Sequence, residues 1–182
     1  MNFAIVGCGF VADLYMDALS RHPGLVLCGV WDRDPKRLTA FTAHHKARAY
    51  DSYDSLLSDN SVQLLVNLTN PREHFAVSKA ALLAGKHVYS EKPLATELAD
   101  ATSLVELAES KGLLITSAPC SVLSETAQTI WKVLDDGLIG TPRLVYAELD
   151  DGNVAAMNHA SWVSASGAPW PARDEFEVGC TL

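Results

Sequence analysis

The stretch FAIVGCGFVADLYMDAL, residues 3–19, decides the fold of this 182-residue chain. Its first four residues have the apolar pattern of a buried strand, and the next six, GCGFVA, match G-x-G-x-x-G/A. Apolar residues then recur at helical spacing over residues 10–22. Asp32 follows 20 residues after Ala12, at the end of a second apolar run, residues 25–31. A strand, a glycine loop, a helix and an acid in this order are the fingerprint of a dinucleotide-binding βαβ unit.

The small residues of the glycine loop have separate expected roles. Gly7 permits a tight turn, Gly9 lets the backbone approach a pyrophosphate, and Ala12 allows the helix to pack closely on the strand. The pyrophosphate is expected at the start of the helix, beside Phe10 and Val11, because unpaired N–H groups and the helix dipole favour negative charge there. The alternative is a glycine-rich turn in another α/β fold.

Asp32 favours NAD as the cofactor. Its carboxylate can accept hydrogen bonds from both ribose hydroxyls, and it would repel the 2′-phosphate of NADP. Arg33, with Lys36 and Arg37 close behind it, could offset that repulsion, so NADP stays possible. The alternative for Arg33 is a solvated loop charge.

Strand-like and helix-like runs continue to alternate as far as residue 118. The strands are apolar throughout, which indicates a parallel sheet that is covered on both faces. The pattern therefore predicts an α/β fold with a doubly wound parallel sheet of the Rossmann type. The expected strands are residues 3–6, 25–31, 62–68, 87–90 and 113–116. Two of the expected helices are residues 10–22 and 96–111, and a third is capped by Asp34. A fourth helix is expected to start at Asn70, with Glu73 in a capping box, and to end at Gly85.

The motif TNPREH, residues 69–74, follows the expected strand 62–68. Ligands of doubly wound sheets bind outside the carboxyl ends of the strands, so Thr69 and Asn70 are expected to face the cofactor. His74 could point there too. A buried helical histidine that is hydrogen-bonded to a backbone carbonyl is an equal alternative.

The motif EKPLA, residues 91–95, follows the expected strand 87–90. A charged pair, Glu91 and Lys92, at the end of an apolar strand is unusual for packing alone. Beside a nicotinamide, the ammonium group of Lys92 can hydrogen-bond a substrate hydroxyl and stabilise its oxygen as hydride leaves the carbon. The alternative is an exposed loop lysine.

The pattern changes after residue 118. A helix that ends at Gly137 and a strand over Leu144–Leu149 are expected, followed by a loop-like stretch. The last seven residues have the pattern of a starting element rather than of a polar tail, so we expect a truncated chain. The predicted domains are residues 1–118 and the beginning of a second domain, residues 119–182.

Composition excludes several classes of protein. The formal net charge is −8 and the pI is near 5.1, which argues against nucleic-acid partners and against an anionic membrane surface. No apolar run is long enough to span a membrane, and no signal peptide precedes the first strand. The cysteines are widely spaced, which predicts reduced thiols in a cytoplasmic protein and no metal site; they are Cys8, Cys28, Cys120 and Cys180.

The glycine-loop unit, the TNPREH motif and above all the segment AGKHVYSEKPLA, residues 84–95, resemble the Gfo/Idh/MocA family of oxidoreductases. The resemblance extends over residues 1 to about 150. It implies a Rossmann domain followed by an α/β domain with a large open sheet for substrate binding and oligomerisation. It also implies NAD(P)-dependent hydride transfer to or from a sugar, polyol or similar substrate in carbohydrate metabolism, by a homo-oligomer when full length. A regulatory dinucleotide-binding protein without activity and an NAD-dependent glycosidase of the same fold are the alternatives.

Carried over by position, the resemblance assigns Lys92 and Glu91 to the reaction centre, with a Lys92–Pro93 bond that is often cis in relatives. The family's acid/base histidine has no match, because His159 lies in a loop-like stretch and is expected to be a surface or substrate-loop residue. We expect that histidine beyond Leu182 and therefore expect the chain alone to be inactive. The implied cofactor-binding residues are Gly7, Gly9, Phe10, Val11, Ala12, Asp32, Arg33, Thr69, Asn70, His74, Glu91 and Lys92.

Overall fold

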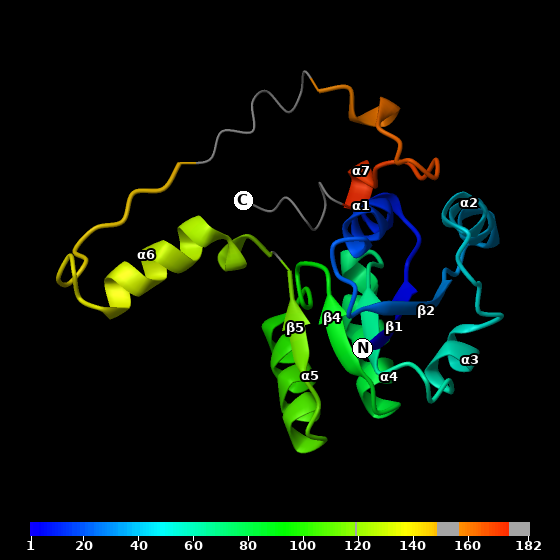
Figure 1. The fold of residues 1–182 in the computed structure, drawn as a ribbon, viewed down its shortest axis with the longest axis horizontal. Coiled ribbons are helices and arrows are strands. Elements are labelled where there is room, and N and C mark those ends of the chain that lie inside the picture. Colours follow the sequence, from blue (N-terminus) through cyan, green and yellow to red (C-terminus); the bar gives the residue numbers. More distant parts are fainter. Residues whose placement is uncertain (119, 149–156, 175–182) are drawn as a thin grey trace. The chain divides into compact units, whose positions relative to one another are not determined.

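The structure, a computed structural model, describes residues 1–118, 120–148 and 157–174. These residues fall into two compact units (Figure 1). The first unit holds residues 1–118 together with 159–174, and the second holds the described residues between them. The domain division after residue 118 stays a prediction.

The first unit is built on one parallel sheet with the strand order β2-β1-β3-β4-β5. All five strands run parallel, and the order turns back at β1, so the predicted doubly wound Rossmann-type fold is confirmed. The carboxyl ends of all the strands therefore lie along one edge. The strands are β1 (Asn2–Val6), β2 (Val26–Trp31), β3 (Leu64–Asn67), β4 (His87–Ser90) and β5 (Ile115–Ser117).

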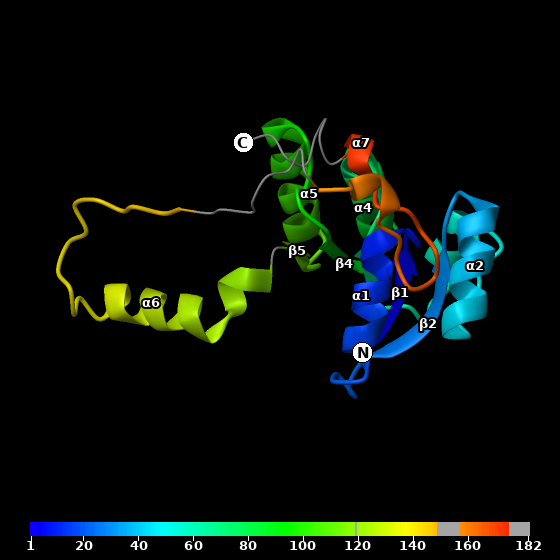
Figure 2. The ribbon, with the colours of Figure 1, turned by 90° about the horizontal axis from the view of Figure 1, so that it is seen from above.

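Helices cover both faces of the sheet, and each face has its own apolar core (Figure 2). Alternate residues of β1 point to opposite faces, as the period of a strand requires: Phe3 and Ile5 belong to one core, and Ala4 and Val6 to the other. Burial of these apolar side chains is the main favourable contribution to folding. The first core is completed by α1 (Phe10–Leu19) and α2 (Pro35–His45), and the second by α3 (Tyr53–Leu57), α4 (His74–Leu83) and α5 (Leu98–Ser110).

Two of the expected helix signals have different outcomes. Asp34 caps α2, since its carboxylate accepts hydrogen bonds from the backbone N–H groups of the first turn at 2.9 and 3.4 Å. The capping box of Asn70 and Glu73 is wrong. The Asn70 side chain makes no cap hydrogen bond, residues 71–73 form a 3₁₀ turn, and α4 begins at His74. The carboxylate of Glu73 instead pairs with Arg33, which draws it away from the backbone of Asn70.

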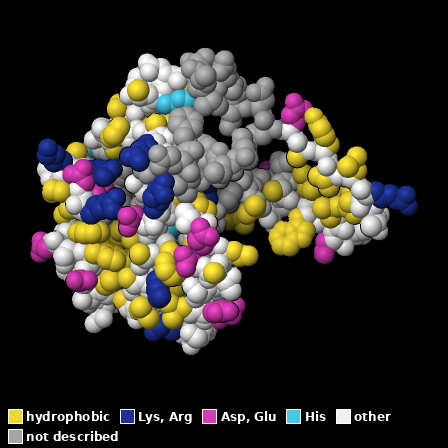
Figure 3. Space-filling model, turned by 180° about the vertical axis from the view of Figure 1, so that it is seen from behind, with side chains coloured by type: hydrophobic (Ala, Val, Ile, Leu, Met, Phe, Trp, Pro, Cys, Tyr) yellow, Lys and Arg dark blue, Asp and Glu magenta, His cyan; other side chains and the backbone are white. Residues whose placement is uncertain are grey.

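The second unit contains a 3₁₀ turn and the helix α6 (Glu125–Asp135), whose N-terminus is capped by the hydroxyl of Ser124. Apolar side chains stand out on the surface of this unit (Figure 3), and Trp131 of α6 is 66% exposed. The expected strand Leu144–Leu149 is wrong for its described part, because residues 144–148 are not in a strand; Leu149 lies outside the described residues. The described part of this unit contains no strand, so residues 144–148 have no neighbouring strand there with which to form backbone hydrogen bonds.

Within the described ranges, no helix is both long and apolar enough to cross a membrane. The same ranges contain no group of three or more histidine, cysteine or acidic residues that could hold a metal ion.

Candidate functional site

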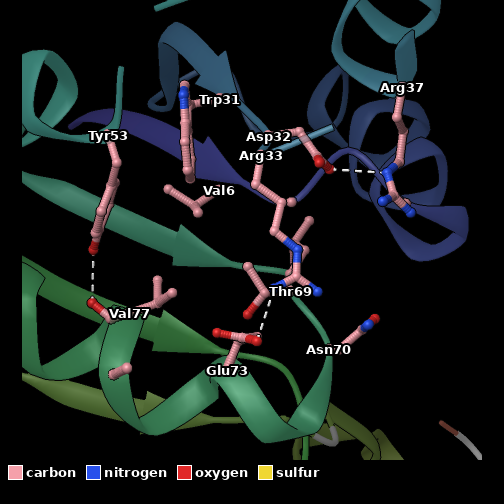
Figure 4. A pocket seen from close by; sticks show the side chains of 14 residues that line it. Val6, Trp31, Asp32, Arg33, Arg37, Tyr53, Thr69, Asn70, Glu73 and Val77 are labelled. Carbon is pink, nitrogen blue, oxygen red and sulfur yellow. Dashed lines mark hydrogen bonds and ion pairs between the residues drawn. The ribbon is translucent and has the colours of Figure 1, made fainter. Parts of the chain in front are cut away.

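Two adjoining cavities lie at the carboxyl ends of the strands in the first unit. The first cavity has a volume of about 280 Å³ and is shown in Figure 4; the second has about 240 Å³. The two cavities adjoin and are together called the trough; five residues line both: Gly9, Arg37, Leu68, Thr69 and Asn70.

The glycine loop forms the floor of this trough. Gly7 has a φ of +96°, and a Cβ atom there would lie 2.5 Å from the carbonyl oxygen of Leu68, so only glycine fits. Gly9 differs, since its backbone is extended and a Cβ atom would meet nothing within 4 Å. As the N-cap of α1, Gly9 also supplies no side chain to occupy the first-turn N–H groups. Ala12 is fully buried against the sheet, as close packing of the helix requires.

Asp32 is fixed at the edge of the first cavity. Its Oδ2 accepts a hydrogen bond from the backbone N of Cys8 at 2.8 Å and lies 3.2 Å from Nε of Arg37. Its Oδ1 accepts from the backbone N of Asp34 at 2.8 Å. Asp32 thus ties the glycine loop to the start of α2. A carboxylate has about four lone-pair positions, which leaves acceptor capacity for a ligand.

Cys8 lies beneath this loop and is fully buried. Burial and the nearby carboxylate of Asp32 raise the pKa of its thiol well above the usual range. The thiol is therefore a packing group and not a nucleophile.

The outer wall of the first cavity is aromatic (Figure 4). The rings of Trp31 and Tyr53 stack with a centroid distance of 5.4 Å, and the Tyr53 hydroxyl donates to the carbonyl of Val77 at 2.7 Å. Arg33 reaches across the cavity to Glu73, with Nη1 2.8 Å from Oε1. Arg33 is thus exposed but forms an ion pair with Glu73, so it is not simply the solvated loop charge given as the alternative. Trp31 and Tyr53 were not identified from the sequence, where only the position of Trp31 at the end of a strand could have pointed to them.

His74 links the two loops that follow β3 and β4. It is 1% exposed, and its Nδ1 lies 2.6 Å from the carbonyl oxygen of Pro93 and its Nε2 2.9 Å from that of Thr69. The hydroxyl of Thr69 in turn donates to Oδ1 of Asn67 at 2.6 Å. His74 is thus the buried, carbonyl-bonded histidine that the sequence offered as an alternative to a cofactor contact, and it also lines the second cavity. Its part in cofactor binding stays a prediction.

Glu91 and Lys92 line the second cavity, as do Phe10 and Val11. Both carboxylate oxygens of Glu91 have partners within the chain: Oε1 accepts from the hydroxyl of Tyr15 at 2.6 Å, and Oε2 from the backbone N of Lys92 at 3.0 Å. Burial and the hydrogen bond to Glu91 raise the pKa of Tyr15, which keeps its phenol protonated as the donor. The Lys92–Pro93 peptide bond is cis.

The third wall of the second cavity comes from far along the chain. Pro169, Trp170 and Pro171 line it, at the end of a hairpin in which Val163 pairs with Pro169. His159 is half-buried, and its ring stacks on Trp170 with a centroid distance of 4.8 Å, so it is not a simple surface residue. No local pattern in the sequence indicated that this segment meets the glycine loop.

Comparisons with known proteins agree with this geometry. The family model described as "Oxidoreductase family, NAD-binding Rossmann fold" matches residues 1–118. Trans-1,2-dihydrobenzene-1,2-diol dehydrogenase from Macaca fuscata fuscata is 28% identical over 171 residues, which cover 92% of this chain and 51% of that protein.

Two solved structures have the same fold. The WlbA dehydrogenase from Bordetella pertussis, in complex with NADH and UDP-GlcNAcA, superimposes with a TM-score of 0.70 at 28% identity over 77% of this chain and 44% of that one. Biliverdin reductase from Synechocystis sp. PCC 6803, with biliverdin and NADP+, gives a TM-score of 0.64 at 29% identity over 74% and 42%. The chain spans about half the length of the curated relatives it matches.

Proposed function

The chain belongs to the Gfo/Idh/MocA oxidoreductase family, an NAD-binding Rossmann family, and on that premise we propose that it transfers hydride between a nicotinamide dinucleotide and the carbinol carbon of a sugar, polyol or similar substrate. The observation that carries the proposal is the trough. Its two cavities carry Asp32 in one and Glu91 with Lys92 in the other, they share Gly9, and a Cβ atom at Gly9 would meet nothing within 4 Å.

The adenosine half of the dinucleotide belongs in the first cavity. Asp32 lies at its edge with acceptor capacity for the ribose hydroxyls, and the apolar slot beside Trp31 and Tyr53 suits an adenine ring. NAD is the preferred form because the carboxylate repels a 2′-phosphate. Arg33 and Arg37, which flank it, lessen this repulsion, so NADP is the weaker ligand rather than an excluded one.

The pyrophosphate belongs over Gly9, at the N-terminus of α1. The first-turn N–H groups of this helix carry no side-chain cap, and the helix dipole favours an anion there. Phe10 and Val11 follow Gly9 directly in the chain and line the second cavity together with Lys92, so a ligand bound over Gly9 can extend into that cavity.

The nicotinamide half belongs in the second cavity, and its ring supplies the hydride acceptor or donor when it is bound. Lys92 is the group that meets the substrate oxygen. In the reducing direction its ammonium group would donate a hydrogen bond to the substrate carbonyl oxygen and stabilise the negative charge that grows there as hydride adds to the carbon. In the oxidising direction it would stabilise the same alkoxide after a base has taken the hydroxyl proton and before hydride leaves the carbon. Glu91 orients Lys92 through the backbone hydrogen bond at 3.0 Å. His74 holds the loop that carries Pro93 against the loop of Thr69.

The substrate class is proposed from the relatives. One is a dehydrogenase of a dihydrobenzene diol, and another was solved with a nucleotide sugar. Both ligands carry a secondary alcohol, which is the group that a hydride-transferring site with one positioned lysine can oxidise. A homo-oligomer and a substrate domain that starts after residue 118 are parts of the same proposal.

The test has two arms. Calorimetric titration of this chain with NADH and NADPH measures dinucleotide binding. Reduction of NAD⁺, followed by absorbance, is measured with the full-length protein, because the chain alone is expected to be inactive, against a panel of sugars, polyols and diols. Binding together with turnover of a member of the panel supports the proposal. Binding without turnover of any member favours a regulatory role, release of a sugar without net reduction of NAD⁺ favours a glycosidase, and the absence of binding contradicts the proposal.

A further inference from the structure

Asp13 is a buried carboxylate next to the glycine loop that none of the roles above uses. It follows Ala12 directly in the first turn of α1 and is 3% exposed. His45, at the end of α2, places its Nε2 against Oδ1. Ser166 donates twice to Oδ2, from its backbone N at 3.1 Å and from its hydroxyl at 2.9 Å.

These hydrogen bonds keep Asp13 charged in spite of its burial. Burial alone would raise the pKa of its carboxyl, but hydrogen bonds from Ser164, His45 and Ser166 lower that pKa below its usual value. A buried carboxylate without such partners is very costly. The contact with Ser166 is therefore favoured strongly, although the two residues lie 153 positions apart.

Ser166 is at the tip of the hairpin 162–170. A tight turn closes this tip, with Gly167 N donating to the Ser164 carbonyl at 2.9 Å and Ser164 N donating to the Ala168 carbonyl at 2.8 Å. A hydrogen bond of 2.9 Å from Trp170 N to Trp162 O closes the base. In Figure 2 the orange segment that contains the hairpin runs beside α1, in agreement with these contacts.

The returning strand of this hairpin leads straight into the wall of the second cavity. Pro169, Trp170 and Pro171 line that cavity, as do Glu91 and Lys92. Because the tip is closed by backbone hydrogen bonds and bonded to Asp13, the position of Asp13 bears on where this wall lies.

We propose that Asp13 is a positioning residue for the nicotinamide half of a bound dinucleotide. It does not touch the ligand; through Ser166 it holds the hairpin 162–170 against the second cavity. This inference rests on the proposed function, since it takes the second cavity as the nicotinamide end.

The proposal requires a selective effect on binding. No residue of the hairpin lines the first cavity, whereas three residues in or next to it line the second. Loss of the Asp13 contact should therefore weaken a ligand that fills both cavities and spare one that fills only the first. NADH is a ligand of the first kind, and AMP is one of the second.

The experiment compares Asp13→Asn and Ser166→Ala with wild type by calorimetric titration of NADH and AMP. Asp17→Asn, an exposed acid on the same helix, is the matched control. Asp13→Asn removes the charge that both Ser166 hydrogen bonds meet and is expected to weaken NADH binding about tenfold or more, whereas Ser166→Ala keeps the backbone bond and is expected to weaken it about threefold to tenfold. AMP affinity should stay within about twofold of wild type in every variant, and the control should match wild type with both ligands.

The outcomes separate the possible failures. NADH binding by Asp13→Asn that equals wild type overturns the inference and leaves the proposed function standing. If Asp13→Asn loses both ligands through misfolding, Ser166→Ala decides, because it leaves α1 intact; unchanged NADH affinity in that variant overturns the inference. Wild-type protein that binds AMP but not NADH overturns the proposed function and the inference together.

Discussion

Tyr15, in the helix that starts at the glycine loop, donates a hydrogen bond of 2.6 Å to Glu91, at the end of β4. The other oxygen of the same carboxylate accepts from the backbone of Lys92. Glu91 thus connects the helix on which the pyrophosphate is expected to lie with the residue expected to meet the substrate. Under the proposed function, Glu91 is then a positioning group and Lys92 is the group that acts on the substrate oxygen.

Tyr15→Phe should destabilise the fold through this connection. The change removes a part-buried hydrogen bond to a carboxylate, and we expect a loss of about 1.5–3 kcal/mol in the free energy of unfolding, measured in urea. Tyr89→Phe is the matched control, because the Tyr89 hydroxyl reaches that of Tyr15 only at 3.5 Å and the Tyr15–Glu91 bond survives. Equal losses of unfolding free energy in Tyr15→Phe and Tyr89→Phe would show that the hydrogen bond from Tyr15 to Glu91 does not stabilise the fold.

Asp32→Ser should change cofactor preference. The substitution removes the charge that disfavours a 2′-phosphate, while Arg33 and Arg37 stay in place, so the preference for NAD over NADP should narrow or reverse. Titration with both cofactors measures the ratio of affinities. Asp34→Ser serves as the control, since serine also caps a helix and Asp34 lines neither cavity of the trough. A wild-type protein that clearly prefers NADP defeats the hypothesis.

Lys92→Ala should separate turnover from binding. Loss of a positioned group of this kind lowers turnover by a factor on the order of 10²–10⁴, whereas NADH affinity should change much less. Rates are measured in the full-length protein, with whichever alcohol in the panel it oxidises. Lys79→Ala, an exposed lysine of α4 that lines neither cavity, should leave the rate unchanged. Turnover by Lys92→Ala within a few-fold of wild type would remove Lys92 from the chemistry.

Stability in acid should depend on Asp59. Hydrogen bonds from the Ser61 hydroxyl, Tyr50 and the Ser61 backbone N lower the pKa of Asp59 from 3.8 to about 2. Because the folded pKa is the lower one, this stabilisation is present above pH 3.8 and is lost as the pH falls toward 2. Asp59→Asn should therefore lose less stability than wild type between pH 5 and pH 2.5, measured as urea midpoints. The exposed Asp51→Asn is the control. If the urea midpoint of Asp59→Asn falls with pH as steeply as that of wild type, Asp59 does not contribute to acid stability.

Local signals predicted most of the first unit. The strand and glycine loop at residues 3–12, the cap at Asp34 and the acid at Asp32 each depend on neighbours in sequence, and the structure confirms the parallel sheet and the cap. Two local predictions failed because partners elsewhere decide them. Glu73 pairs with Arg33 instead of capping α4, and residues 144–148 have no described strand to pair with.

The parts of the site that the sequence did not predict all join residues far apart in the chain. Trp31 with Tyr53, Tyr15 with Glu91, and Asp13 with Ser166 belong to different elements, which only the fold brings together. Periodicity and motif spacing report one element at a time, so they carry no information on such contacts.

The central claim is that a dinucleotide lies across Gly9, and NADH titration of Gly9→Val against wild type tests it most directly. The backbone of Gly9 is extended and a Cβ atom there meets nothing within 4 Å, so a side chain can be added, at a cost of about 1 kcal/mol for an apolar residue at an N-cap. The new side chain would occupy the space expected for the pyrophosphate, and we predict NADH binding weakened about tenfold or more in a protein that still unfolds cooperatively in urea. A Gly9→Val protein that binds NADH as tightly as wild type would contradict the account.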